Sequence, residues 1–449
     1  LTGSIPVSIK QCSNLQYIML NSNQLQGDMM LDYFSNNKNI RALHLDHNNL
    51  TGTIPAEFTT WVYDHRPVFN ITYNCLSGSL PLELISNPDW PRAEACIIPQ
   101  NEGYNLEVPI LYESTDYSED GKVVVLQKAT EGNGINVAIV GDGFADVDFT
   151  SGHFDKVMHK TMEGLFRQEP MKSFRHLFNV YAVKAVSKHN VFLDGCETAL
   201  EGKYGSNNSG YSYAECKEGT LRNKYINKIP AFNPDEDICF VILNAYTPNA
   251  SASYCRYPQG FSYSISGLGS YTPASNNLHG FENKICRGFG CTFGHLGSEE
   301  WNSFGGAATD ATKEVILNYQ ANGWYANLSV DPENVPWNKF MTDERYTNED
   351  IGIYEGGMYC AFGIYRSSNT SIMRMTNIDE VTFNVPSREA IYKRMMQQAY
   401  GDSWQYDYEK FVEYDAINRN STPQLLRSTA DAPKEDRLQY YPMVIIHEQ

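Results

Sequence analysis

One short segment in the second half of the chain holds side chains that could bind a metal. Cys291, His295 and Glu299 are spaced four residues apart, so on one continuous helix they would share a face and could together bind Zn²⁺. Two glycines lie between them, and glycine weakens a helix. We therefore expect the helix to end before Glu299 and no metal to bind; if one binds, these three residues are its ligands.

Two cysteines in the same segment allow other chemistry. Cys286 and Cys291 could form a disulfide, but five residues apart on a helix their Cβ atoms point in different directions. A nucleophilic pair of Cys291 and His295 would need a third group to orient it, and the sequence identifies none. We predict two buried free thiols.

A glycine-containing turn, residues 141–144 (Gly-Asp-Gly-Phe), follows an apolar run and could suggest phosphate binding. The remaining spacing of a dinucleotide fingerprint and the Lys-Ser/Thr of a P-loop are missing. Gly-x-Ser-x-Gly is absent from the chain, so a hydrolase elbow has no support. We predict a tight turn between a strand and a helix, with Asp146 or Asp148 as the cap.

Composition excludes some classes of partner. The net charge is −18 with 20% charged residues, and the acidic residues are spread along the chain. Nucleic-acid binding needs clustered Lys and Arg, so we expect none. No apolar run approaches the length of about 20 residues that spans a bilayer. Leu1 opens in the middle of a repeat, so we expect the natural N-terminus to lie upstream.

The ten cysteines match no zinc-ribbon or disulfide framework. Cys75 with Cys96, and Cys196 with Cys216, are candidate pairs. For most of the others we expect buried free thiols.

The first 80 residues contain a repeat. Leucines 1, 25, 50 and 76 recur at intervals of 24 to 26 residues. Three of them, Leu1, Leu50 and Leu76, are the first residue of Leu-Thr-Gly-Ser-Ile-Pro or a close variant. This pattern resembles a leucine-rich repeat. In each copy alternating apolar residues predict a short strand, and Asn23, Asn48 and Asn74 are expected to hydrogen-bond the turning backbone.

After the repeats the pattern changes to apolar, β-branched runs that alternate with helical spacing, which predicts an α/β sheet with crossover helices. The predicted strands are 121–127, 135–140, 178–186, 238–243 and 443–447, and the predicted helices are 154–166 and 388–399. Residues 421–436 are predicted to be a polar surface stretch.

Several spaced segments of this second part occur in the same order in a known family. They are residues 116–122, 135–144, 171–187, 293–300, 355–359, 363–366 and 371–374. In this order they resemble the bacterial IgA-peptidase family of zinc metallopeptidases, exported proteins of gut-type bacteria. The resemblance implies a metzincin-like fold and a zinc-dependent hydrolase.

In that family a helix carries His-Glu, a short spacer and a second His, which bind Zn²⁺ and activate a water. Here the second His falls on Cys291, and the first on Cys286 or Arg287 depending on the spacer. The general-base Glu falls on Arg287 or Gly288 accordingly. Arg287 would place a fixed positive charge where a dication binds. We expect the two thiols to fill the former ligand pocket.

The resemblance assigns four further positions. The family's acidic pair falls on Ser298 and Glu299. Met373 falls in a segment that implies a methionine turn beneath the zinc, and it is otherwise a plain core residue. His295 falls on a variable position that we expect to be exposed.

We therefore predict a leucine-rich solenoid and cap over residues 1–98, a connector over 99–130, and an α/β metallopeptidase-like domain with a mixed sheet and flanking helices over 131–449. The outward strand positions of the solenoid form a mixed face that names no ligand; they include Gln16, Met19, Arg41 and His44. A role as a spacer or cap is equally open for this short array.

The predicted protein is exported, extracellular or at the cell surface, with an outer-membrane anchor left open. We predict that it has lost zinc-dependent peptidase activity, needs no cofactor, and binds a protein or glycan. Two alternatives stay open: an active zinc metallopeptidase with an atypical metal site, and a structural surface scaffold.

Overall fold

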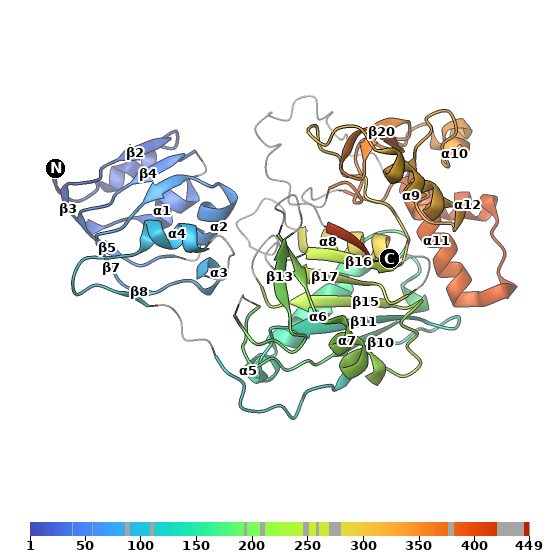
Figure 1. Ribbon diagram of the computed structural model, residues 1–449, viewed down its shortest axis with the longest axis horizontal. Helices are drawn as coiled ribbons and strands as arrows, with labels where there is room; N and C mark the ends of the chain where they lie inside the picture. The colour runs from blue at the N-terminus through green and yellow to red at the C-terminus, as the bar shows by residue number, and fades with distance from the viewer. Residues whose placement is uncertain are drawn as a thin grey trace. The chain divides into compact units, whose positions relative to one another are not determined.

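The structure is a computed structural model, and it divides the chain into two compact units (Figure 1). The first unit is essentially Leu1–Tyr112, and the second is the rest of the chain apart from two short loop pieces. The structure describes all 449 residues except 38, 56, 86–89, 108–111, 193–194, 207–211, 246–250, 257–259, 269–279, 376–380, 420–443 and 449. The predicted polar stretch at 421–436 lies outside the described residues.

Two sheets of parallel strands run through the first unit. One has the strand order β2-β4-β6 and the other the order β1-β3-β5-β7. The strands of the first sheet are β2 (Tyr17–Met19), β4 (Ala42–His44) and β6 (Val68–Asn70). Those of the second are β1 (Thr2–Gly3), β3 (Gln24–Asp28), β5 (Asn49–Gly52) and β7 (Cys75–Leu76). The helices are α1 (Leu31–Asn36), α2 (Glu57–Asp64), α3 (Leu82–Ile85) and α4 (Trp90–Ile97).

Amide side chains hold successive turns of this coil together, as the sequence predicted. The Oδ1 atoms of Asn48 and Asn74 each accept a hydrogen bond at 3.0 Å from a leucine N–H of the preceding turn. Gln100 does the same for the next turn, where its Oε1 accepts from the N–H of Leu76 at 3.2 Å. The coil then continues to β9 (Leu106–Glu107), which pairs in parallel with β8 (Gly78–Ser79), and so extends past the boundary expected at residue 98.

The second unit is built on a mixed sheet of seven strands in the order β10-β12-β11-β15-β17-β16-β21. The strands are β10 (Val123–Gln127), β11 (Ile135–Asp142), β12 (Phe178–Val183), β15 (Ile238–Leu243), β16 (Ser251–Arg256), β17 (Tyr263–Gly267) and β21 (Val444–Glu448). The neighbours β12, β11, β15 and β17 run parallel, while β10 and β16 are antiparallel to their neighbours β12 and β17. The central strands are almost wholly buried and apolar, as expected for parallel strands covered on both faces. The predicted mixed sheet is confirmed.

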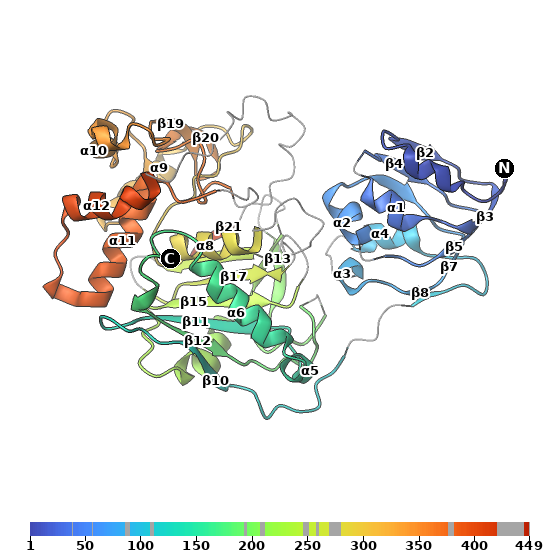
Figure 2. The ribbon, with the colours of Figure 1, turned by 180° about the vertical axis from the view of Figure 1, so that it is seen from behind.

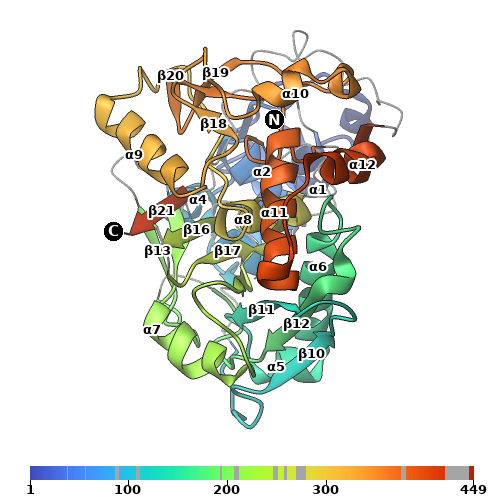
Figure 3. The same cartoon turned by 90° about the vertical axis from the view of Figure 1, so that its right-hand side faces the viewer.

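Three helices of the second unit matter for the site. They are α6 (His153–Leu165), α8 (Gly280–Thr292) and α11 (Val385–Tyr400). Helices α6 and α8 contact each other (Figure 2), and α8 also packs on strands β15, β16 and β17. Helix α11 lies beside the C-terminal end of α8 (Figure 3), where the Gly294 backbone meets the Ile391 side chain. The predicted helices 154–166 and 388–399 are confirmed as α6 and α11.

The remaining elements surround this core. A small sheet has the order β18-β20-β19, with β18 (Leu328–Ser329), β19 (Tyr354–Gly357) and β20 (Cys360–Arg366). A hairpin pairs β13 (Lys203–Ser206) with β14 (Ser212–Glu215). The other helices are α5 (Asp146–Thr150), α7 (Glu218–Thr220), α9 (Asp310–Ala321), α10 (Asn338–Thr342) and α12 (Tyr408–Arg419). Single 3₁₀ or π turns lie at Val7–Gln11, Arg175–Leu177, Leu221–Tyr225, Ile226–Lys228, Glu344–Tyr346 and Gly401–Ser403.

The turn after β11 is the tight one that the sequence predicted. Gly143 has a φ of 76°, and a Cβ there would lie 2.8 Å from the backbone nitrogen of Phe192. This close approach requires glycine. Neither candidate is the N-cap of the following helix, which is Ala145. Asp148, at the third position of that helix, accepts from the N–H of Ala145 at 2.8 Å, whereas Asp146 accepts from the backbone N–H groups of Thr115 and Asp116.

Candidate functional site

Helix α8 ends at Thr292, so only one of the three spaced metal-ligand candidates lies on it. The N–H groups of Phe293 and Gly294 both reach the carbonyl of Phe289, and His295 then turns the chain away with a φ of 51°. Cys291 is in the last turn of the helix, while His295 and Glu299 follow it. The predicted break before Glu299 is confirmed.

Arg287 is the most completely buried charged residue of α8, with no exposed surface. Its Nη1 donates to Glu300 Oε1 at 2.5 Å and its Nη2 donates to Ser298 Oγ at 3.1 Å. Burial raises the pKa of the Glu300 carboxyl, and the guanidinium of Arg287 limits that rise. A buried ion pair therefore joins α8 to the segment that follows it.

The two cysteines of α8 lie on different sides of the helix. The Cys286 thiol donates to the carbonyl of Gly164 on α6 at 3.2 Å. Cys291 instead hydrogen-bonds with Ser253 on β16 and with Arg287, and burial raises its pKa to about 11. Both are free, protonated thiols, as predicted, but they do not fill one common pocket, because their side chains diverge around the helix.

Gly288 marks where α8 packs directly on the sheet. A Cβ built at this position would lie 2.2 Å from Ser264 Oγ and 2.8 Å from Ser264 Cβ on strand β17. These distances are far inside van der Waals contact, so no side chain fits without moving the helix. In the register that places the general base here, the fold excludes a glutamate.

Glu299 is fully buried and joins several separate segments. Its carboxylate accepts from Asn327 Nδ2 at 2.8 Å, from Asn384 Nδ2 at 2.8 Å, and from the hydroxyl of Ser371. Burial raises its pKa, and these three hydrogen bonds oppose the rise. The partners lie 28, 85 and 72 residues away in sequence, and no local pattern pointed to them. The lone pairs of the Glu299 carboxylate that accept these hydrogen bonds are not available to bind a metal.

His295 was expected to be exposed, and the structure corrects this. Its ring stacks on Trp324 with centroids 3.7 Å apart and planes 14° from parallel. Its Nδ1 lies 3.4 Å from Nη1 of Arg394. Burial and the nearby guanidinium lower its pKa to about 2, so the ring is neutral and accepts from the arginine. Trp324 follows α9, so sequence distance concealed the stacking partner.

Met373, which the resemblance assigns to a methionine turn, packs against α8. It is fully buried, and its Sδ would meet a Cβ at Gly290 of α8 at 2.8 Å. Its carbonyl accepts from the N–H of Glu299 at 3.1 Å. The residue therefore supports both α8 and the segment after it.

These residues do not fit a zinc site. Cys291, His295 and Glu299 face β16, Trp324 and a set of amide and hydroxyl donors respectively. Among the residues that the structure describes, no group of three or more His, Cys, Asp and Glu is placed to hold a metal ion. A buried guanidinium beside Cys291 would also repel a dication.

Neither candidate disulfide from the sequence is present. Cys75 and Cys96 are separate thiols, and Cys216 hydrogen-bonds with Tyr263. In the described parts of the chain, no helix has the length and apolar character needed to cross a bilayer.

A sequence model of the family described as IgA Peptidase M64 matches residues 124–249 of this chain. The match supports the predicted resemblance of this part of the chain to an IgA-peptidase-type metallopeptidase family. It runs from β10 past the end of β15 and includes the Gly143 turn, but it stops before α8. A search of curated proteins found no match. The correspondence between α8 and the family's metal-binding helix therefore stays a prediction.

Proposed function

We propose that this chain is a non-catalytic relative of the IgA-type peptidases that acts by binding a protein or glycan. The observation that carries the proposal is the buried ion pair between Arg287 on α8 and Glu300 in the segment that follows the helix. A guanidinium at this place contributes the positive charge that a metal would otherwise supply to nearby acceptors. It neither activates water nor polarises a carbonyl as zinc does.

Two further features support the loss of catalysis. The sheet contact at Gly288 leaves no space for a general base. The raised pKa of Cys291 keeps that thiol protonated at neutral pH, and a protonated thiol is a poor metal ligand and a poor nucleophile. We expect the purified protein to cleave nothing in a broad peptide library, with or without added zinc. Cleavage that a chelator abolishes and zinc restores would refute the loss of activity.

We also propose that the N-terminal coil is a leucine-rich repeat solenoid whose strand face binds the partner. Across β2, β4 and β6 the register aligns Tyr17, Ala42 and Val68 in one row. Tyr17 is 60% exposed, Val68 is 64% exposed, and the neighbouring Met19 is 57% exposed. Ala42, between Tyr17 and Val68 in this row, is buried. Exposed apolar side chains gathered on one face of a sheet are typical of interaction surfaces. The sequence had indicated only a mixed face there.

Binding by this face can be tested with glycan arrays and with defined cell-surface proteins. The variant Tyr17→Ser with Val68→Ser should lose a partner that the wild-type protein binds. The control is Val7→Ser, which changes a residue of similar exposure, 68%, outside the three strands. Equal binding by all three proteins would exclude the strand face.

The proposed location is outside the cell or at its surface, in keeping with the exported family that the chain resembles. Fractionation of the source cells with an antibody against the purified protein tests this. Recovery in the culture medium or the surface fraction is expected, and recovery only with cytosolic markers would contradict it.

A further inference from the structure

A cavity in the second unit lies apart from the ion pair on α8. Its volume is about 630 Å³, within the range of small-molecule sites. Its walls come from the loop 233–237, from Arg256, Gly260 and Ser262, from the C-terminal end of α8 with His295, from the segment after α9, and from α11. The lining is mainly polar and charged, so the cavity suits a hydrophilic ligand.

One wall of the cavity carries a positive charge that no carboxylate neutralises. Arg394 on α11 is bonded through Nη1 to neutral His295 and lies over the ring of Phe293, 5.1 Å from its centroid. Its Nε has no hydrogen-bond partner, and among the described residues no carboxylate lies within ion-pair distance. Arg256, in the same cavity, differs because Glu218 pairs with it at 2.5 Å. Arg394 is thus the wall's available cation.

The loop 233–237 brings negative charge to the same cavity. Asp235 and Glu236 are exposed, and in the described part of the chain neither is ion-paired. Glu236 acts electrostatically on Arg394 but forms no ion pair with it. Opposite charges therefore share the cavity without neutralising each other.

Asp237 anchors the loop 233–237 to helix α11. Its carboxylate accepts from Asn136 Nδ2, Asn233 N and Gln398 Nε2 at 2.9, 2.7 and 3.0 Å. Gln398 is one helical turn beyond Arg394 on α11. This anchor fixes the acidic loop to the helix, so both charges are held in position before any ligand arrives.

We propose that this cavity binds a small zwitterion, a free amino acid or a short peptide, with its carboxylate at Arg394 and its ammonium at Glu236 and Asp235. A simple anion would meet the repulsion of the acidic loop, and a simple cation that of Arg394. A sugar would lack its usual aromatic platform, because Trp324 is only 5% exposed and His295 covers one face of its ring. The proposal is independent of the partner suggested for the strand face.

The test is calorimetric titration of the full chain with each proteinogenic L-amino acid and with diglycine and triglycine. For the best ligand, the matched N-acetyl and carboxamide derivatives each remove one charge. Both derivatives should bind at least about tenfold more weakly, as expected for a lost charge-assisted hydrogen bond. Preference for the free amino acids or for the peptides distinguishes the two sources.

Arg394→Gln and Glu236→Gln should each weaken binding about tenfold or more, while Arg394→Lys should retain part of it. The control is Glu333→Gln, an exposed carboxylate outside the cavity, and it should bind like wild type. Melting curves of each variant identify unfolding. Equal binding of the N-acetyl or carboxamide form, or no binding of any zwitterion to the wild-type protein, would overturn the proposal.

Discussion

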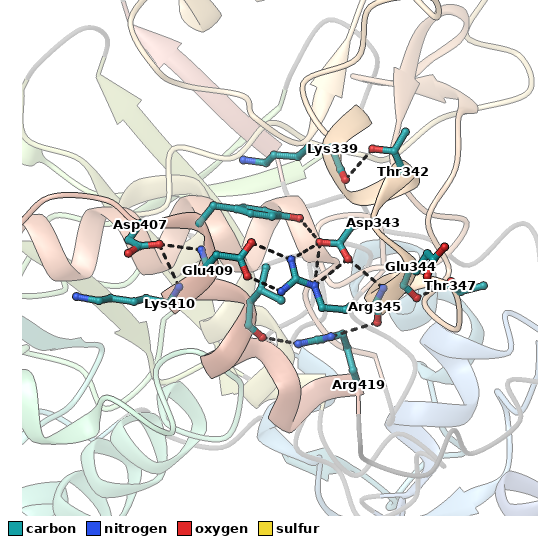
Figure 4. A network of polar contacts seen from close by, with 12 residues as sticks. Lys339, Thr342, Asp343, Glu344, Arg345, Thr347, Asp407, Glu409, Lys410 and Arg419 are labelled. Carbon is teal, nitrogen blue, oxygen red and sulfur yellow. Dashed lines mark hydrogen bonds and ion pairs between the residues drawn. The ribbon is translucent and has the colours of Figure 1, made fainter.

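Two arginine–carboxylate networks in the second unit differ sharply in their surroundings. Arg287 is fully buried on α8 and pairs with Glu300, whose side chain is 16% exposed. Arg345 lies near the surface, where its side chain is 42% exposed, and it contacts Asp343 and Glu409 (Figure 4). In the second network the Tyr408 hydroxyl also donates a hydrogen bond to the Asp343 carboxylate. The network links the segment after α10 to α12.

The difference shows that the number of contacts is a poor guide to their importance. Water screens Arg345 and can replace either carboxylate when one is lost. Arg287 is out of reach of water, so removal of one buried partner leaves the other charge without its ion-pair partner. The pair on α8 should therefore be the more sensitive point, although it has fewer hydrogen bonds.

The largest expected effect comes from breaking the buried pair. Arg287→Met should lower the free energy of unfolding by about 3–5 kcal/mol, because the largely buried Glu300 carboxylate loses its ion-pair partner. Denaturant titration measures this. The double variant Arg287→Met with Glu300→Leu should recover much of the loss, since two apolar side chains need no counterion. A single variant as stable as wild type would show that the pair does not hold α8.

The next comparison is with Asp142, a buried carboxylate that is held by hydrogen bonds and, among the described residues, not by an ion pair. Burial raises the pKa of Asp142, at the end of β11, from 3.8 to about 6. The folded state thus binds the proton more tightly than the unfolded state, so this contribution to stability is full below pH 3.8 and is lost as pH rises to about 6. The loss amounts to about 3 kcal/mol.

Asp142→Asn should flatten that part of the pH profile. The Thr198 hydroxyl that now donates to the carboxylate can rotate to accept from an amide. Denaturant titrations of both proteins across this pH range give the comparison. A variant with the same pH dependence as the wild-type protein would rule out Asp142 as the source.

A smaller effect should follow from filling the contact between α8 and the sheet. Gly288→Ala should cost about 1–3 kcal/mol, because the new methyl would overlap Ser264. Gly219→Ala is the matched control, since a Cβ there meets nothing within 4 Å. Thermal melting measures both. If Gly288→Ala is as stable as the control, α8 is free to shift and a side chain at this position is tolerated.

The smallest effect should come from the exposed network. Arg345→Ala should leave the melting temperature indistinguishable from that of the wild-type protein, because its pairs with Asp343 and Glu409 are solvated. A large loss of stability would mean that exposure is the wrong criterion for separating the two networks.

The parts of the molecule that depend on local pattern were predictable from the sequence. Apolar β-branched runs predicted β11 and β15, and helical spacing predicted α6 and α11. The repeat predicted the roles of Asn48 and Asn74, while Gln100 was missed because a glutamine replaces the repeated asparagine. The predicted strand over 178–186 ends at Val183, after which single bridges replace the ladder.

The environment of the candidate site was less predictable, because it depends on contacts between distant segments. The break of α8 followed from two glycines, but the burial of His295 depends on Trp324 and Arg394. The donors to Glu299 come from three segments far along the chain. The cavity proposed to bind a zwitterion is likewise lined by five separate segments, and no local spacing in any of them indicates a common site.

The most direct test of the central claim, that α8 holds an ion pair in place of a metal, is the zinc content of the purified protein. We expect no stoichiometric zinc by elemental mass spectrometry after dialysis against zinc-containing buffer, and the same result for Cys291→Ser. Stoichiometric zinc in the wild-type protein that is lost in Cys291→Ser would contradict it.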